Sequence, residues 1–488
     1  MKLVKGLFYI ALLVTIILNA SGTTAYAYRA QSVSPESFLS SSLNNPNLKQ
    51  APGESWAWNA AYNIEHFMYA YRAWGDTGWL DAAVKYYDYL VSQLQKGPDG
   101  YLGWIGPYIY DTTQWCDAHV SDALLFNGML HFAEIVLQYP ELEKVYGEKA
   151  RHYVQLAEVH LIEKWDARGT WYEYGPFGTY FSWNYYLNPE DFSRWHKRDN
   201  IKNSNLSLPA NKNTRMAIAA LRLFRITGKE EYRDKAVKIF ALLKSRMQLY
   251  NDFYVWNYWE PTVPWDINVK ANTMRHWVGV HPTASYQTNE TWDIAEAYLS
   301  GIVFTEEDIQ RIINTNLKVM WNQDRTAPAY RSSSAGIQST SDAGALWPAL
   351  AYFDQTARDL INFGGTSSRD RIFHAYLENV VFAEPPSFKR TLLRDGIIKE
   401  LDFPQSSVRN INMALVLPSV AKPGEVMILA ANTLQSGRLR VELYDAAGAN
   451  ALLTLLNRQV GKGLVTFTWN GRDGQGNQLP PGDYRVRW

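Results

Sequence analysis

Apolar residues recur at three- and four-residue spacing from Glu54 to about Phe382, with polar residues between them. This period predicts a series of amphipathic helices. The expected helices cover residues 54–73, 77–95, 117–138, 141–165, 208–226, 229–248, 288–300, 305–322, 342–363 and 367–380. Because short turns separate successive ranges, the helices are expected to pair as hairpins.

One helix-turn-helix pattern occurs twice. Residues 71–85 read Tyr-Arg-Ala-Trp-Gly-Asp-Thr-Gly-Trp-Leu-Asp-Ala-Ala-Val-Lys, and residues 224–238 repeat the pattern with Gly228 in place of Gly75. A single hairpin cannot bury its apolar face, so repeated hairpins stack on their neighbours. The sequence therefore predicts a mainly α fold in which helical hairpins form a ring or a stack.

Residues at the expected helix ends support these boundaries. Gly75, Gly228 and Gly301 stand where helices should end, since glycine readily adopts the left-handed conformation of a helix C-terminus. Thr305 and Ser367 are each followed three residues later by an aspartate, a pattern typical of helix N-terminal caps.

Four segments between the expected helices are rich in Trp and Tyr and lack a clear period. They cover residues 98–116, 166–207, 250–287 and 323–341. Aromatic residues make up 14% of the whole chain. These four segments are too rich in aromatic residues to be disordered. Long loops in compact domains usually carry function. We expect the four segments to converge on one face of the ring and form a cleft.

The period changes to two from Ile411 onward, which predicts a small β-sandwich. Its expected strands include residues 439–444, 453–456, 464–469 and 484–488. The glycine- and asparagine-rich stretch from Trp469 to Tyr484 resembles the Ig-like module of flagellar hook-capping proteins and of secreted bacterial enzymes. The resemblance implies a structural or attachment role, here attachment to the cell surface.

The N-terminus has the features of a secretory signal. Lys2 and Lys5 precede a short apolar run, and Ala25-Tyr26-Ala27 forms a cleavage site. We expect a secreted or cell-surface protein, cleaved after Ala27. The expected parts are a signal peptide (1–27), a catalytic (α/α) toroid (28–382), a linker (383–410) and an Ig-like β-sandwich (411–488).

Composition limits the class of partner. The formal net charge is zero, which argues against nucleic acid, because nucleic-acid binding needs a basic surface. No zinc-protease or EF-hand motif occurs, so no metal or cofactor is expected. Flat aromatic rings match the C–H faces of sugars, and the expected partner is a polysaccharide or oligosaccharide.

Residues 50–380 resemble the six-hairpin (α/α) toroid superfamily, in architecture rather than in any one motif. That superfamily contains glycoside hydrolases, polysaccharide lyases and sugar epimerases. The resemblance implies a carbohydrate-active enzyme but assigns no catalytic residue, so candidates must come from the chemistry of the side chains.

Residues 256–293 hold the densest set of candidates, and they suit β-elimination at a uronic acid. That reaction needs a base, an acid and a group that neutralises the carboxylate. His281 is the candidate base and Tyr286 a base or acid. Arg275 and Asn213 would bind the carboxylate. The same groups would serve a uronate epimerase, which begins with the same proton abstraction.

Two alternatives remain open. Glycoside hydrolysis would use paired carboxylates, with Glu260 and Asp266 as the first candidates because Trp and Pro flank them. Glu290, Asp117 and Asp122 are further candidates for that chemistry. The third alternative is a non-catalytic glycan-binding surface protein, which would have the aromatic cleft without the acid and base.

Several aromatic residues are candidates for binding sugar rings. They are Trp58, Trp183, Tyr186, Trp256, Trp259, Trp265 and Trp277. Trp58 lies in a segment that also contains Glu65 and His66, at the start of the first long helix.

Overall fold

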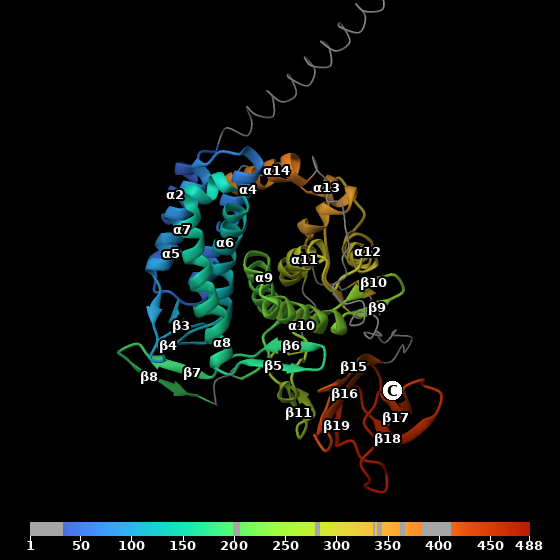
Figure 1. The fold of residues 1–488 in the computed structure, drawn as a ribbon. Helices are drawn as coiled ribbons and strands as arrows, with labels where there is room; N and C mark the ends of the chain where they lie inside the picture. Colours follow the sequence, from blue (N-terminus) through green and yellow to red (C-terminus); the bar gives the residue numbers. More distant parts are fainter. Residues whose placement is uncertain are drawn as a thin grey trace, which may run out of the picture.

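The computed structural model describes residues 33–198, 205–278, 284–334, 337–338, 344–361, 367–381 and 411–488. Helices dominate up to Val381, and strands make up the region from Ile411 onward (Figure 1). The mainly helical fold with a C-terminal strand-rich part is therefore confirmed. The predicted signal peptide (1–27) and the predicted linker (383–410) lie outside the described residues.

The long helices pair as hairpins through short turns. The pairs are α4 (His66–Trp74) with α5 (Gly78–Ser92), α6 (His119–Gln138) with α7 (Pro140–Ala157), and α9 (Ala210–Thr227) with α10 (Glu230–Arg246). α11 (Ala284–Leu299) is likewise followed by α12 (Glu306–Asn314) after a short turn. Gly75 and Gly228 follow α4 and α9 with φ of 69° and 72°. A side chain strains this left-handed conformation, which explains why the repeated turn keeps a glycine.

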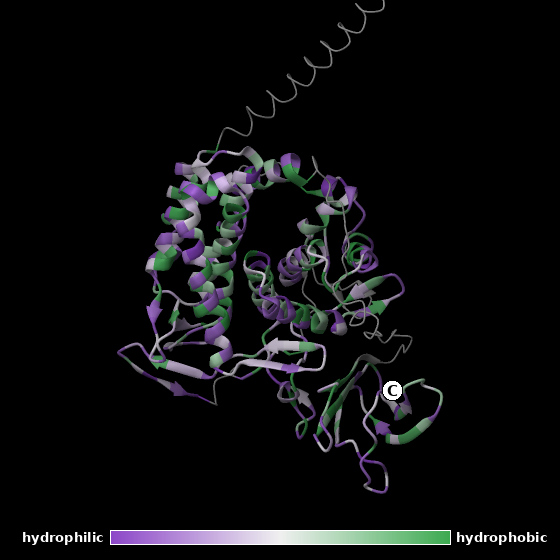
Figure 2. Ribbon diagram, viewed as in Figure 1, coloured by the Kyte–Doolittle hydropathy of each residue, from purple (hydrophilic) through white to green (hydrophobic). Residues whose placement is uncertain are grey.

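Several helices from different parts of the chain pack side by side, and we call these the inner helices. α14 (Ser368–Tyr376) lies against α4, α3 (Glu54–Ala61) against α6, α6 against α9, and α9 against α11. Figure 1 shows α4, α6, α9, α11 and α14 around an open space, with α5 and α7 farther from it. One apolar core runs through them, and Figure 2 shows hydrophobic and hydrophilic positions mixed along each helix, as amphipathic helices require.

Some helix boundaries differ from the prediction. The expected first helix is interrupted between Ala61 and His66, giving α3 and α4. The expected helix over 342–363 is wrong: η5 (Pro348–Tyr352) is a 3₁₀ turn, and α13 (Gln355–Leu360) is short. Pro348 cannot continue a preceding helix, and the side chain of Asp354 caps a new one by accepting from the Ala357 N–H at 2.9 Å.

The aromatic segments form short antiparallel hairpins instead of loops without secondary structure. One sheet has the order β3 (Gly106–Tyr108), β4 (Asp111–Cys116), β7 (Tyr185–Asn188), β8 (Asp191–Lys197). Separate pairs are β5 (Trp171–Tyr174) with β6 (Phe177–Tyr180), β9 (Gln248–Tyr250) with β10 (Phe253–Val255), and β11 (Ile267–Asn268) with β12 (Thr273–Met274). Cross-strand aromatic pairs stabilise such ribbons despite their weak period.

The C-terminal part is a sandwich of two three-stranded sheets, as predicted. Their orders are β15 (Ile411–Leu417), β16 (Met427–Thr433), β19 (Gly463–Trp469), and β18 (Ala451–Val460), β17 (Gly437–Asp445), β20 (Tyr484–Arg487). Leu429 and Val441 are among the buried residues between them. The sandwich contacts the helical part at Asn272, whose Oδ1 accepts from the Thr466 N–H at 2.6 Å.

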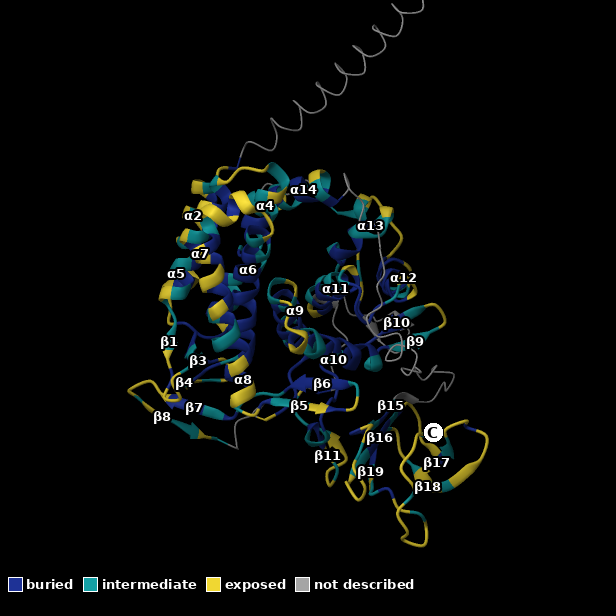
Figure 3. Ribbon diagram, in the orientation of Figure 1, coloured by how far each residue is buried: buried dark blue, intermediate teal, exposed yellow. Residues whose placement is uncertain are grey.

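Both predicted helix N-terminal caps, Thr305 and Ser367, are present. Thr305 and Ser367 accept hydrogen bonds from the backbone N–H groups of Asp308 (3.2 Å) and Asp370 (3.1 Å). In the described part, α6 alone is long and apolar enough to cross a membrane. It is almost entirely buried among the other helices (Figure 3), as the core helix of a globular fold would be.

Candidate functional site

The N-terminal ends of α3, α9 and α11 lie close together at the end of the helical part that carries the aromatic hairpins, hereafter the loop end. Lys212 on α9 forms an ion pair with Glu54 on α3. The Ala210 N–H donates to the Tyr258 carbonyl at 3.0 Å, and Gln287 on α11 donates to the Trp256 carbonyl at 2.6 Å. Helix N-termini carry partial positive charge, so this end favours anions.

Exposed aromatic rings contact one another at the loop end. Tyr110, Trp277 and Tyr286 are 39%, 38% and 40% exposed. Tyr286 stacks on Tyr258 with ring centroids 4.1 Å apart, and Tyr110 meets Trp277 edge-to-face at 6.3 Å. We call Tyr110, Trp277, Tyr286 and the buried Tyr258 on which Tyr286 stacks the aromatic surface. Clustered, exposed rings of this kind commonly mark binding sites.

The Glu54–Lys212 ion pair lies within electrostatic range of the aromatic surface. Burial raises the pKa of Tyr258, and the neighbouring Tyr286 and Glu54 raise it further. The side chains of Glu54 and Lys212 are 11% and 13% exposed. The loop end therefore combines exposed rings with one ammonium and one carboxylate that retain limited contact with solvent.

The predicted elimination residues fall partly in this region. Tyr286 and Trp277 belong to the aromatic surface, and Arg275 precedes Trp277 in the same loop. Arg275 Nη1 donates to the Trp265 carbonyl at 3.0 Å. His281 lies outside the described residues, so its predicted role as base stays a prediction.

Asn213 is buried and holds β6 against α9. Its Oδ1 accepts from the Tyr180 N–H at 3.0 Å, and its Nδ2 donates to Thr179 Oγ1 at 2.6 Å. The predicted contact between Asn213 and a substrate carboxylate would require these bonds to break. Lys212, the preceding residue, is the α9 side chain that carries positive charge at the loop end.

Glu260 and Asp266 point into the protein interior. Asp266 is fully buried and accepts from the backbone N–H groups of Ser207 (2.9 Å), Thr262 (2.9 Å) and Val263 (3.1 Å). Glu260 accepts from the Asn257 N–H at 2.6 Å, and burial raises its pKa to about 7. Both carboxyl groups therefore bind backbone N–H groups of the protein, Asp266 also across to Ser207 of another segment. The predicted hydrolytic pair would instead need to face a substrate.

Glu290 is the buried acid beneath the loop end. Its Oε2 accepts from Trp256 Nε1 at 2.5 Å, whereas Oε1 has no hydrogen-bond partner among the described residues. Burial raises the pKa of Glu290 to about 8, so its carboxyl group is mostly protonated at neutral pH. A protonated carboxyl group has the chemistry of a general acid.

The shifted pKa of Glu290 gives a testable pH dependence. The pKa of Glu290 in the folded protein lies above its ordinary value of 4.5, so the native state binds this proton more tightly than the unfolded chain does. The native state therefore loses stability as the pH rises from about 4.5 to about 8. We expect Glu290→Gln to raise the melting temperature relative to the wild type at pH 8 but not at pH 4. Glu148→Gln, at an exposed position on α7, is the matched control. An unchanged pH dependence in Glu290→Gln would contradict this assignment.

Only some of the predicted sugar-binding aromatics are accessible. Tyr186, Trp256 and Trp259 are each 2% exposed, so their rings are not available to stack on a sugar. Trp58, Trp183 and Trp265 are half-buried. Trp277 is the most exposed member of the predicted set whose burial the structure describes.

Asp117 and Asp122 belong to a buried charge cluster. Lys164, with a fully buried side chain, lies 2.7 Å from a carboxylate oxygen of each aspartate. Arg168 bonds Asp117 at 2.8 Å and lies 4.0 Å from the ring centre of Trp183. These contacts join β4, α6 and α8 (Lys164–Ala167) and leave neither aspartate exposed to a substrate.

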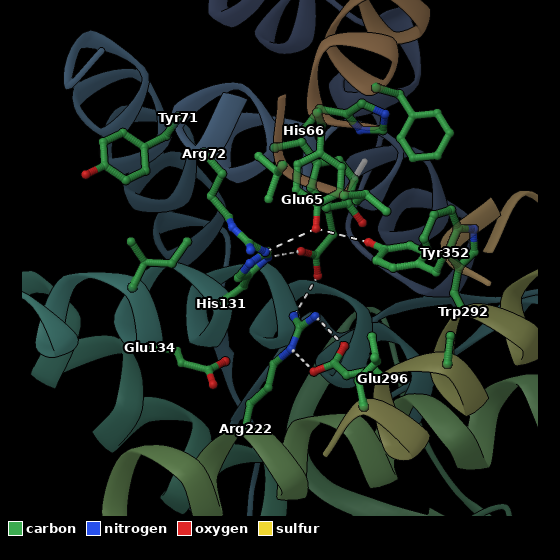
Figure 4. A pocket seen from close by; sticks show the side chains of 18 of the residues that line it. Glu65, His66, Tyr71, Arg72, His131, Glu134, Arg222, Trp292, Glu296 and Tyr352 are labelled. Carbon is green, nitrogen blue, oxygen red and sulfur yellow. Dashed lines mark hydrogen bonds and ion pairs between the residues drawn. The ribbon is translucent and has the colours of Figure 1, made fainter. Parts of the chain in front are cut away.

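A large cavity, which we call the central cavity, lies among the inner helices and is absent from the sequence prediction (Figure 4). Its volume is about 1170 Å³. Arg222 bonds Glu65 at 2.7 Å and Glu296 at 2.8 Å, and His131 Nδ1 lies 2.5 Å from Glu65. Burial by itself would raise the pKa of Glu65. The neighbouring Arg222 and His131 outweigh this effect and lower the pKa of Glu65 to about 2.

Sequence reasoning missed this cavity because its charged residues come from separate helices. Glu65, His131, Arg222 and Glu296 are spread over more than half of the helical part, and each resembles an ordinary residue on a helix's polar face. Glu65 and His66, and Asn289, Trp292 and Asp293 of the 256–293 segment, lie in segments that the sequence marked, but the sequence did not bring the two segments together. No group of three or more His, Cys, Asp or Glu residues able to hold a metal occurs in the described ranges.

The fold and the loop end define a mainly helical protein with a C-terminal Ig-like module. Residues 422–487 match the family model of the FlgD Ig-like domain, which confirms the resemblance of the module to hook-capping proteins. A search of curated proteins found no match to the chain. The match describes the β-sandwich and says nothing of the helical part.

Proposed function

We propose that the helical part is an (α/α) toroid that binds a uronic acid-containing polysaccharide on the aromatic surface and cleaves it by β-elimination. The observation that carries the proposal is the exposed position of Tyr286, stacked on Tyr258 at the N-terminal ends of the inner helices. The order of packed inner helices, α14–α4 and α3–α6–α9–α11, supports the toroid.

Charge at the loop end favours an acidic sugar. The N-terminal ends of α3, α9 and α11 are partially positive. Lys212 brings an ammonium group to the same end, where it is paired with Glu54 and would exchange that partner for the sugar carboxylate. Elimination becomes easier when the sugar carboxylate is neutralised, because negative charge builds up there as the α-proton leaves. In this proposal Lys212 and Arg275 bind the carboxylate.

The proton transfers complete the proposed reaction. A base removes the proton α to the carboxylate, the bond to the leaving glycosidic oxygen breaks, and that oxygen takes up a proton as the double bond forms. Tyr286 carries an accessible hydroxyl suited to one of these transfers, and His281 is the candidate for the other. Secretion and attachment to the cell surface through the Ig-like module belong to the same proposal.

Glycoside hydrolysis is the second candidate because of Glu290. A carboxyl group that stays protonated near neutral pH can donate to a leaving oxygen. Glu54 would be the second acidic residue, at the same end. Hydrolysis would require a substrate to reach Glu290, which is buried beneath Trp256. A glycan-binding protein without catalysis is the third candidate and would use the exposed rings alone.

A product assay separates the three candidates. The purified protein is incubated with a panel of acidic and neutral polysaccharides, and both the ultraviolet absorbance of unsaturated uronate and the release of reducing ends are followed. Absorbance on an acidic glycan supports elimination, whereas reducing ends without absorbance indicate hydrolysis. Binding that Trp277→Ala weakens, with no turnover of any glycan, would leave only the binding function.

A further inference from the structure

The central cavity has a wall formed by α4 and α14 on which two guanidinium groups lie. Arg72 donates from Nη1 to the Tyr376 hydroxyl at 3.1 Å, and Arg369 lies 3.2 Å from the ring centre of Tyr62. Within the part of the chain that is described, neither has a carboxylate at ion-pair distance. Burial lowers the pKa of Arg369 to about 10, as expected for a cation with weak compensation.

Aromatic rings lie between and beside these two cations. Tyr69 stacks on Tyr376 with ring centroids 4.5 Å apart. Trp292 on α11 contacts Phe373 on α14, at a centroid distance of 5.5 Å. The side chain of Trp292 is half-buried and borders the cavity (Figure 4). This wall therefore offers flat apolar faces next to uncompensated positive charge.

The opposite wall is a network of paired charges from α6, α9 and α11. Arg225 bonds Glu134 at 2.5 Å and Glu296 at 2.7 Å. Glu65 and His131 continue the network toward α4. Because ion pairs hold these side chains in place, binding a ligand costs little further conformational entropy. Their oriented hydrogen-bond donors and acceptors suit a ligand that carries hydroxyl groups.

We propose that the central cavity is a second binding site, which takes a single acidic sugar. The sugar carboxylate binds Arg72, with Arg369 adding positive charge on the same wall. The sugar ring lies against Tyr69 or Trp292, and its hydroxyls bond the network on the opposite wall. A cavity of about 1170 Å³ has room for a sugar with its bound water. Guanidinium groups that lack a carboxylate partner select an acidic ligand over a neutral one.

This site is distinct from the aromatic surface. None of the four residues of the aromatic surface is among the residues that line the cavity. The lining includes the turn at Gly75, Arg225 near the end of α9, and Thr288 in the first half of α11. The aromatic surface is built around the first turns of α9 and α11, where Tyr258 and Tyr286 lie. The proposal therefore goes beyond the proposed cleavage and does not depend on it.

Calorimetric titration of the full chain tests the second site. The probes are galacturonic acid, glucuronic acid, the neutral methyl ester of galacturonic acid, and galactose. We expect at least one acid to bind and the neutral probes to bind about tenfold more weakly or not at all. Arg72→Gln should weaken binding of the acid by about tenfold or more, since the charge-assisted bond is lost.

The controls keep the test specific. Arg151→Gln removes an exposed guanidinium on α7 and should leave the binding unchanged. Tyr286→Phe and Trp277→Ala should also bind the acid normally, even if they abolish cleavage of a polymer. Absence of binding by both acids, equal binding of neutral probes, or an unchanged affinity in Arg72→Gln would each overturn the proposal, as would loss of binding in Trp277→Ala.

Discussion

Replacing Tyr286 with phenylalanine is expected to lower the rate of elimination by about 10²- to 10⁴-fold, the usual contribution of a positioned acid or base. The substitution removes one hydroxyl and keeps the ring that stacks on Tyr258. Tyr286 is 40% exposed, so the fold should be unaffected. The rate is measured from the ultraviolet absorbance of the unsaturated product, and stability from thermal denaturation.

Tyr139→Phe is the matched control, because Tyr139 is 45% exposed at the end of α6, away from the aromatic surface. It should retain the wild-type rate. A Tyr286→Phe variant that eliminates at the wild-type rate would contradict the assigned proton transfer. If the variant still hydrolysed a glycan, Glu290 would become the leading catalytic candidate.

Replacing Lys164 with alanine should have the largest effect on stability. Its side chain is fully buried and lies between Asp117 and Asp122. Removing the ammonium leaves two buried carboxyl groups without their shared partner, a change that typically costs about 3–5 kcal/mol. We expect a clear fall in the melting temperature.

The matched control for Lys164 is Lys149→Ala. Lys149 pairs with Asp88 at 2.6 Å on the surface, where the two side chains are 46% and 41% exposed. Exposed ion pairs contribute at most about 1 kcal/mol, since water screens them and flexible side chains must be ordered. Similar losses of stability in the two variants would contradict the role assigned to the buried cluster.

Local signals in the sequence predicted much of the fold. Gly75 and Gly228 marked the repeated turns because a left-handed residue at a helix end strongly favours glycine. Thr305 marked a helix start because its side chain caps a neighbouring backbone N–H. The period of two likewise predicted the C-terminal strands, because side chains alternate across a sheet.

Contacts between distant segments set the limits of the sequence prediction. The aromatic hairpins are short, and cross-strand pairs such as Trp171 with Tyr180 stabilise them more than local propensity does. Trp256 and Trp277 lie in the same aromatic segment, residues 250–287, yet of the two only Trp277 is exposed. Whether a tryptophan side chain is buried depends on tertiary packing. Tertiary packing also brings Glu65 next to His131, so their ion pair could not be predicted from the sequence.

The most direct measurement is the ultraviolet absorbance of the purified protein incubated with a uronic acid-containing polysaccharide, compared with Tyr286→Phe under the same conditions. The account predicts that absorbance rises with the wild type, as the unsaturated product accumulates, and that the variant shows almost none. If no acidic polysaccharide produces absorbance while reducing ends appear, elimination at the aromatic surface is wrong.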